Sequence, residues 1–219
     1  MTAIPKPKPA VPSPRLSDRN LARFVCMAAN RQMRFLHDQK YPRAAPQIFA
    51  VPYYGRALSG IRDAMKRGFA GIIDARGKLE GIGQATKRAN NQRVFEAFVG
   101  SPHAKRKLVV LTAHRYQAYK RTLEVKFSPH VVAKEGDETR YIYFHERGEQ
   151  CDPEQARLTL EFGYWVLQQN GVDCTPDQFE LIDLFGGKYF KGEPIRPSTL
   201  KLLDDMARHI ESQWPTIEP

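Results

Sequence analysis

Residues 122–146 read TLEVKFSPHVVAKEGDETRYIYFHE, and this stretch decides the fold. β-branched and aromatic residues, which favour strands, fill much of 122–133 and 140–145. Between them lies Glu135-Gly136-Asp137-Glu138, a run of residues typical of a turn. The pattern therefore predicts two strands joined as a β-hairpin.

The chain after this hairpin predicts a buried helix. Asp152 is a good N-cap, Pro153 suits the first helical position, and Asn170-Gly171 is a typical helix end. Apolar residues between these signals cover most of the helix circumference. We therefore expect this helix to be buried on more than one side.

Two further elements complete the C-terminal part. The segments 179–185 and 188–190 flank Gly186-Gly187, which predicts a second β-hairpin. Ser198 predicts the start of a closing helix. The inner face of that helix is expected to carry Leu203, Met206, Ile210 and Trp214.

The chain before the first hairpin predicts mainly amphipathic helices. One is expected from Ser17 to about Leu36, and two more over 54–66 and 84–99. A short strand is expected at 108–111, where the period of the apolar residues shifts toward two.

Residues 1–15 are rich in proline and lysine, which predicts a flexible polyproline-type arm that buries no core. The remainder, 16–219, is long enough for one large domain. Helices precede a β-meander, and a helix, a hairpin and a helix follow it. This order predicts a mixed α/β (α+β) domain with a central mixed sheet flanked by helices.

The charge is unevenly distributed along the chain. The formal net charge is +10, but residues 1–120 hold 23 Lys and Arg against 6 Asp and Glu, whereas residues 121–219 hold 11 against 18. A strongly basic half attracts the phosphates of nucleic acid. DNA or RNA is therefore the expected partner, with an acidic protein partner or a homo-oligomer as the alternative.

The sequence argues against a membrane or secreted protein and against a fold held together by disulfides or zinc. No run approaches the roughly 20 apolar residues that cross a bilayer, and the first residues lack the apolar core of a signal peptide. The three cysteines, Cys26, Cys151 and Cys174, form no close pair, which fits unpaired thiols in a reducing compartment. We expect a cytoplasmic protein with no membrane partner, no disulfide framework and no zinc site.

Basic and aromatic residues off the apolar helix faces are candidates for nucleic-acid binding. Arginine and lysine neutralise phosphates, and tyrosines that alternate with basic residues over 114–121 can stack on exposed bases. For these tyrosines, packing on the core is an equally open alternative. The candidates are Arg19, Arg23, Arg31, Arg34, Arg62, Lys66, Arg88, Arg93, Arg115, Tyr116 and Tyr119.

Glu124-Val125-Lys126 is a candidate catalytic motif in a predicted strand. Because Glu124 and Lys126 are two residues apart, their side chains lie on the same face of the strand. In a metal-dependent nuclease, the carboxylate could hold Mg²⁺ while the lysine helps to activate water or stabilises the developing phosphate charge. A second carboxylate must converge from a neighbouring strand, and the nearest upstream candidate is Asp74. The alternative is an ordinary solvated strand face, which requires no cofactor.

His130 and His145 lie on the two strands of the predicted hairpin. They could meet across it as a metal-binding or acid–base pair, or be separately accommodated in the sheet. Ser59, Ser128 and the three cysteines lack the neighbouring base or elbow motif that nucleophilic catalysis requires.

The order of these elements resembles the RecB-type branch of the PD-(D/E)XK nuclease superfamily. Segment 16–26, LSDRNLARFVC, resembles the opening helix of that branch, and segment 54–61, YGRALSGI, resembles its second helix. The hairpin of 127–146, the helix of 155–167 and the hairpin of 179–190 then follow in the family's order.

The resemblance implies the fold and argues against the activity. In that family the first strand of the hairpin carries a metal-binding Asp, and the second carries an Asp or Glu followed by x-Lys. Here His130 stands in the first region, and His145 and Glu146 stand in the second without the lysine. These three residues therefore occupy degenerate family positions. Of the four cysteines of the branch's iron–sulfur members, only Cys26 matches.

Three hypotheses follow. The first is a catalytically degenerate nuclease-like domain that binds DNA or RNA and could serve as a subunit of a larger DNA-processing or defence assembly. The second is an active Mg²⁺-dependent nuclease that uses Glu124, Lys126 and Asp74. The third is a protein-interaction module with a basic docking face. The first assigns no cofactor and no enzymatic activity.

Overall fold

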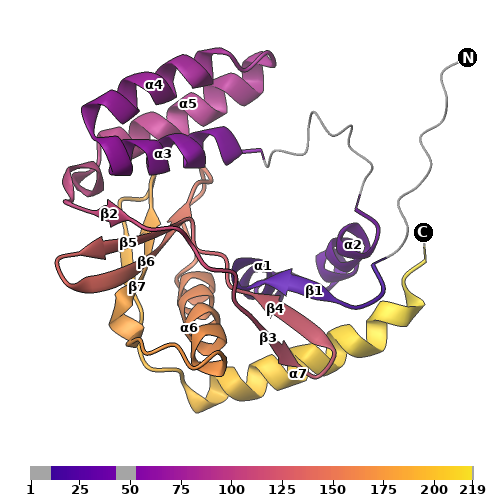
Figure 1. The fold of residues 1–219 in the computed structure, drawn as a ribbon. Helices are drawn as coiled ribbons and strands as arrows, with labels where there is room; N and C mark the ends of the chain where they lie inside the picture. The colour runs from indigo at the N-terminus through magenta and orange to yellow at the C-terminus, as the bar shows by residue number, and fades with distance from the viewer. Residues whose placement is uncertain (1–10, 43–52, 219) are drawn as a thin grey trace, which may run out of the picture.

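The computed structural model describes residues 11–42 and 53–218, which fold into two mixed sheets and their surrounding helices (Figure 1). The elements in chain order are β1 (Arg15–Ser17), α1 (Asp18–Val25), α2 (Ala29–Lys40), α3 (Gly55–Arg67), α4 (Phe69–Glu80), α5 (Ala85–Val99), η2 (Pro102–Lys105), β2 (Val109–Val110), β3 (Gln117–Lys120), β4 (Leu123–Lys126), β5 (Val131–Glu135), β6 (Glu138–His145), α6 (Pro153–Gln169), η3 (Pro176–Gln178), β7 (Phe179–Asp183), β8 (Tyr189–Lys191), α7 (Pro197–Gln213) and η4 (Trp214–Thr216). The mixed α/β class expected from the sequence is confirmed.

The larger sheet has the strand order β2-β5-β6-β7-β8. β5 and β6 pair antiparallel as the predicted hairpin, and Gly136 at its turn has φ +61°, a conformation that favours glycine. β7 and β8 form the second predicted hairpin, with Gly187 at φ +63°. β6 and β7 are parallel, because α6 carries the chain from one to the other.

The smaller sheet, in the order β1-β4-β3, corrects one prediction. Residues 122–133 do not form one strand. They divide into β4, which belongs to the smaller sheet, and β5, which belongs to the larger one. The break contains Pro129, which has no N–H to donate to a strand ladder, so the chain leaves one sheet there before entering the other.

Two apolar cores lie on opposite faces of the larger sheet. In β6, Tyr141 and Tyr143 pack into one core, while Ile142 and Phe144 pack into the other. The first core contains α1, α6 and α7 together with the smaller sheet, and the second contains α3, α4 and α5. Figure 1 shows these three helices as a separate layer above the sheet. The strand is apolar at consecutive positions because both of its faces are covered.

The N-terminal helix begins where the sequence predicted, but it ends earlier than predicted and a second helix follows it. Ser17 caps α1 as predicted, since its Oγ accepts a hydrogen bond from Asn20 N–H at 3.1 Å. The single helix expected up to Leu36 is instead α1 and α2, with Ala28 in an extended conformation between them. The break allows Leu36 of α2 to pack into the same core as Phe24 of α1.

The helix α4 was not predicted. Gly71 and Gly77 weaken its helical pattern. A Cβ at Gly71 would lie 2.2 Å from the Asp63 carbonyl oxygen, so glycine is required where α4 crosses close to α3. The predicted helices at 54–66 and 84–99 are confirmed as α3 and α5, and the buried helix after Asp152 is confirmed as α6.

Both ends of the described chain lie together. Residues 1–10 of the predicted arm lie outside the described residues, but Val11 donates its N–H to the Lys40 carbonyl at 2.9 Å and accepts from Trp214 Nε1 at 3.2 Å. Residues 11–15 are therefore docked, which corrects the predicted arm. α7 begins at Pro197 with Arg196 as its N-cap, so Ser198 lies within the helix and does not cap it as expected. No helix within 11–42 and 53–218 has the length and apolar character to cross a membrane.

Candidate functional site

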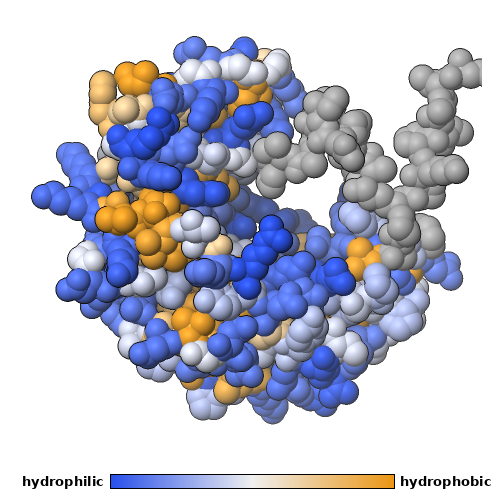
Figure 2. All heavy atoms as spheres, in the orientation of Figure 1, coloured by the Kyte–Doolittle hydropathy of each residue, from blue (hydrophilic) through white to orange (hydrophobic). Residues whose placement is uncertain are grey.

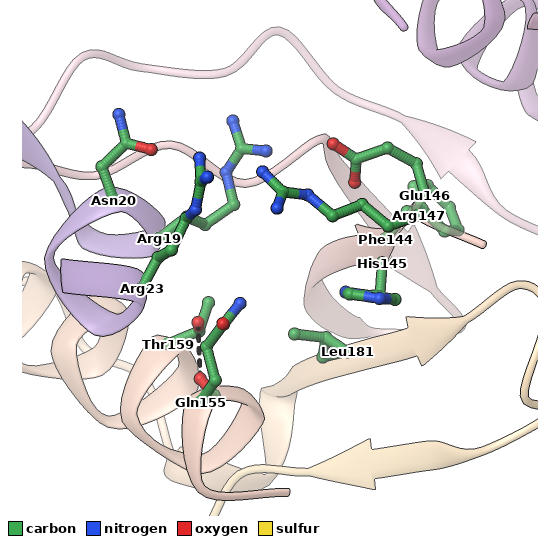
Figure 3. Close-up of a pocket in the computed structure, with 10 residues that line it drawn as sticks. All are labelled: Arg19, Asn20, Arg23, Phe144, His145, Glu146, Arg147, Gln155, Thr159 and Leu181. Atoms are coloured by element: carbon green, nitrogen blue, oxygen red, sulfur yellow. Dashed lines mark hydrogen bonds between the residues drawn. The ribbon is translucent and has the colours of Figure 1, made fainter. Parts of the chain in front are cut away.

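Two adjoining pockets lie where the first turn of α1, the end of β6 and helix α3 meet. The inner pocket is drawn in Figure 3. The outer pocket shares Arg19, Glu146 and Arg147 with it, so the two form one cleft. Figure 2 shows a hollow with mostly hydrophilic residues around it below the α3 layer. We call the joint cleft the arginine cleft, after Arg19, Arg23, Arg62 and Arg147, which line the two pockets.

A buried carboxylate fixes one wall of the cleft. Asp18 is fully buried and accepts hydrogen bonds from Tyr143 Oη at 2.6 Å, Ser128 Oγ at 2.7 Å and Ser128 N–H at 3.1 Å. Burial raises the pKa of Asp18, although these hydrogen bonds oppose the shift. A Cβ at Gly163 of α6 would lie 2.4 Å from Tyr143 Oη, so glycine leaves the room that this network needs.

The network places Arg19, the next residue, over the start of β5. The Arg19 Nε donates to Ser128 Oγ at 3.4 Å, and its guanidinium lies against His130 Nε2. His130 is buried, and its Nδ1 accepts from the Phe144 backbone N–H at 2.8 Å. Burial, followed by the charges of Arg19 and Arg62, holds the pKa of His130 well below its usual value. His130 is therefore neutral at pH 7.

The other guanidinium groups of the cleft converge from separate elements. Figure 3 shows Arg23 rising from α1 toward Arg147, which reaches across from the chain after β6. Burial lowers the pKa of Arg23, and the nearby charge of Arg147 lowers it further. Among the described residues, Arg19, Arg23 and Arg62 have no carboxylate within 4.0 Å, and Arg147 has only the exposed Glu149, at 3.8 Å. The cleft thus concentrates positive charge that is largely unpaired.

The cleft contains little negative charge to offset these arginines. Of the described residues that line the two pockets, Glu146 is the one acidic side chain. Asn20, Gln155 and Thr159 add polar groups to the inner pocket, and Tyr53 and Tyr54 add aromatic rings to the outer one. This chemistry suits a phosphate or another oxyanion better than a metal ion.

The structure places Glu124 and Lys126 elsewhere, in the smaller sheet. The buried Glu124 carboxylate pairs with Arg15 Nε at 3.3 Å and with Lys126 Nζ at 3.5 Å. Arg15 lies directly opposite Glu124 in the parallel β1–β4 pair. The Glu-x-Lys spacing therefore puts the two side chains on one face, as expected, but in an ion-pair cluster with Arg15.

Asp74 does not provide the second carboxylate. It was expected on a strand next to Glu124, but it lies on α4, in the helical layer beyond the larger sheet, where it pairs with Arg67 at 2.6 Å. Figure 1 shows α4 and β4 on different sides of the larger sheet. Within the described chain no group of three or more His, Cys, Asp and Glu side chains is placed to hold a metal ion.

The two histidines follow the second of the alternatives open from the sequence, separate accommodation in the sheet. His145 ends β6, and its Nε2 lies 2.9 Å from the Glu149 carbonyl oxygen. His130 lines the outer pocket and His145 the inner one. Each is engaged with backbone groups of its own surroundings, and the two rings do not pair across the hairpin. The three degenerate family positions, His130, His145 and Glu146, nevertheless all line the cleft.

The remaining predicted nucleic-acid contacts are dispersed. Lys66 is exposed on α3 one turn beyond Arg62, on the same helix face. Arg93 lies over the Phe185 ring, 4.4 Å from its centroid. Tyr116 packs against the core and Tyr119 is exposed. Outside the cleft, Arg31 and Arg34 are exposed on α2, Arg115 is exposed before β3, and Arg88 on α5 is half-buried.

Sequence reasoning missed three features of the cleft: Arg147, the Asp18 network and the tyrosines Tyr53 and Tyr54. Arg147 directly follows Glu146, so the family position already pointed to its neighbourhood. Nothing in the sequence signals that Asp18 pairs with Tyr143, because the two are 125 residues apart. No family model, curated protein or solved structure matches this chain.

Proposed function

We propose that this chain is a non-catalytic, nuclease-like domain that binds the phosphates of DNA or RNA in the arginine cleft. The observation that carries the proposal is the convergence of Arg19, Arg23, Arg62 and Arg147 on one cleft with a single lining carboxylate. Guanidinium groups without ion-pair partners are available to phosphate oxygens, which they bind through charge-assisted hydrogen bonds.

The arrangement of strands supports the nuclease-like part of the proposal. The β5–β6 hairpin, the α6 crossover and the parallel β7 follow the order that the resemblance to the RecB-type branch implies. His130, His145 and Glu146 lie at the cleft where that resemblance puts the metal-binding residues. Replacement of carboxylates by histidine in an arginine-lined cleft favours binding over metal-dependent hydrolysis.

The proposal extends to the setting of the domain. Three cysteines without disulfides support a cytoplasmic location. Phe69 and Ile73, which are 74% and 51% exposed on α4, lie one turn apart and favour a protein partner at that helix. We propose that the domain is a subunit of a larger DNA-processing or defence assembly.

A salt titration tests the proposal. Binding of fluorescent single- and double-stranded oligonucleotides is measured by anisotropy across a range of salt concentrations. Because each neutralised phosphate releases counterions, four arginine contacts predict a log–log slope of roughly −3 to −4. Arg23→Gln is expected to weaken binding by about tenfold and to reduce the slope by about 1.

Arg208→Gln is the matched control, since Arg208 pairs with Asp204 and Asp205 on α7 rather than lining the cleft. It should bind like the unsubstituted chain. No binding at low salt, or a slope that is the same in all three proteins, would reject the proposal. Incubation of the same oligonucleotides with Mg²⁺ or Mn²⁺ should leave them uncut, and reproducible cleavage would overturn the non-catalytic part.

A further inference from the structure

The His130 ring is fixed by a backbone group on one side and points into the cleft on the other. Only 7% of the residue is exposed, and the ring stacks on Phe144 with centroids 5.9 Å apart. The Phe144 N–H approaches His130 Nδ1 at 2.8 Å. Because a backbone N–H can only donate, Nδ1 must be the acceptor, and in the neutral ring the proton is on Nε2.

The group facing Nε2 is also a donor. The Arg19 guanidinium lies against Nε2, and a guanidinium carries five N–H donors and no acceptor. Arg62 lines the same outer pocket and adds a second guanidinium. Two kinds of donor therefore converge on one point of the cleft, where an acceptor that carries negative charge would satisfy both.

We infer that a phosphate oxygen accepts hydrogen bonds from both the Arg19 guanidinium and the His130 Nε2–H once the guanidinium has moved off Nε2, with Arg62 as a further contact. This inference rests on the proposed function and names the point in the cleft at which a phosphate is held. His130 thereby acquires a role at its degenerate family position: it donates to an anion where a carboxylate would have held a cation.

Phosphate at this point couples binding to protonation. Without ligand, burial and the charges of Arg19 and Arg62 hold the pKa of His130 down. A bound phosphate adds negative charge beside the ring and raises that pKa, so binding takes up a proton and strengthens as the pH falls. Glu146 lines the same pocket and is present with and without the phosphate, so it does not produce this change on binding.

The experiment is an NMR titration of ¹⁵N-histidine-labelled protein. Inorganic phosphate is added in one arm and an oligonucleotide without terminal phosphates in the other, with sodium chloride holding the ionic strength constant. The free protein should show His130 as the Nε2–H tautomer. Each ligand should shift the Nε2 resonance saturably and raise the pKa of His130 by about 1, which equals tenfold tighter binding to the protonated form.

Arg19→Gln should abolish the response to inorganic phosphate, and Arg208→Gln should preserve it. The Tyr143 ring signals report whether Arg19→Gln keeps the Asp18 network, and Arg62→Gln, which should weaken the response severalfold, provides a second variant. A free ring protonated on Nδ1, or an Nε2 resonance unmoved by either ligand while the oligonucleotide still binds, overturns the inference and leaves the proposed function standing. A saturable response to phosphate without oligonucleotide binding supports the inference and rejects the proposed function.

Discussion

The smaller sheet and the arginine cleft both contain arginines, but the arginine of the smaller sheet is paired with a carboxylate and those of the cleft largely are not. At Glu124 the carboxylate lies within 3.5 Å of two cations, Arg15 and Lys126, so its charge is used within the fold. In the cleft, Arg19, Arg23 and Arg62 have no such partner among the described residues. The comparison teaches that the pairing of a charge decides its role more than the motif that contains it.

The largest effect on stability is expected at Asp18, whose hydrogen bonds hold one wall of the cleft. Asp18→Ala leaves Tyr143 Oη and the Ser128 groups without their buried acceptor. Each unsatisfied buried group costs roughly 1–3 kcal/mol, so we expect the free energy of unfolding to fall by about 3 kcal/mol or more. Urea denaturation measures this.

Asp18→Asn is the matched control for that variant, because its amide keeps one acceptor oxygen in the same place. It should lose less stability than Asp18→Ala. If both variants unfold at the same urea concentration as the unsubstituted protein, then the Asp18 network does not anchor the wall of the cleft.

A smaller effect is expected in the smaller sheet. Glu124→Gln keeps the size of the side chain and removes its charge, so the pairs with Arg15 and Lys126 are lost. We expect a loss of about 1 kcal/mol in the free energy of unfolding and no change in oligonucleotide affinity. Denaturation and anisotropy on one preparation check both. A tenfold change in affinity with unchanged stability would reverse the contrast between the two regions.

The elements that local sequence determines were predictable. The β5–β6 hairpin follows from its turn residues around Gly136, and α6 follows from its Asp152 cap and Pro153. By contrast, α4 contains Gly71, which its close contact with α3 requires, and no local pattern reveals that contact. The division of 122–133 between two sheets likewise depends on pairing with β1, more than 100 residues earlier.

The candidate site was predictable in part, for the same reason. Arg19, Arg23 and Arg62 were expected to contact phosphate from helix patterns alone, and the structure brings these three together. Whether a charged residue is paired depends on residues distant in sequence. Glu124 and Asp74 were therefore candidates for catalysis from the sequence, which does not show that they pair with Arg15 and Arg67.

The most direct test of the central claim is the salt dependence of oligonucleotide binding by Arg19→Gln/Arg147→Gln. These two residues line both pockets, so the loss of their charges removes about two phosphate contacts. The matched control is Arg76→Gln/Arg208→Gln, which removes two arginines that pair with carboxylates elsewhere. The account predicts a log–log slope reduced by about 2 in the cleft variant and unchanged in the control. Equal slopes in the two double variants would contradict it.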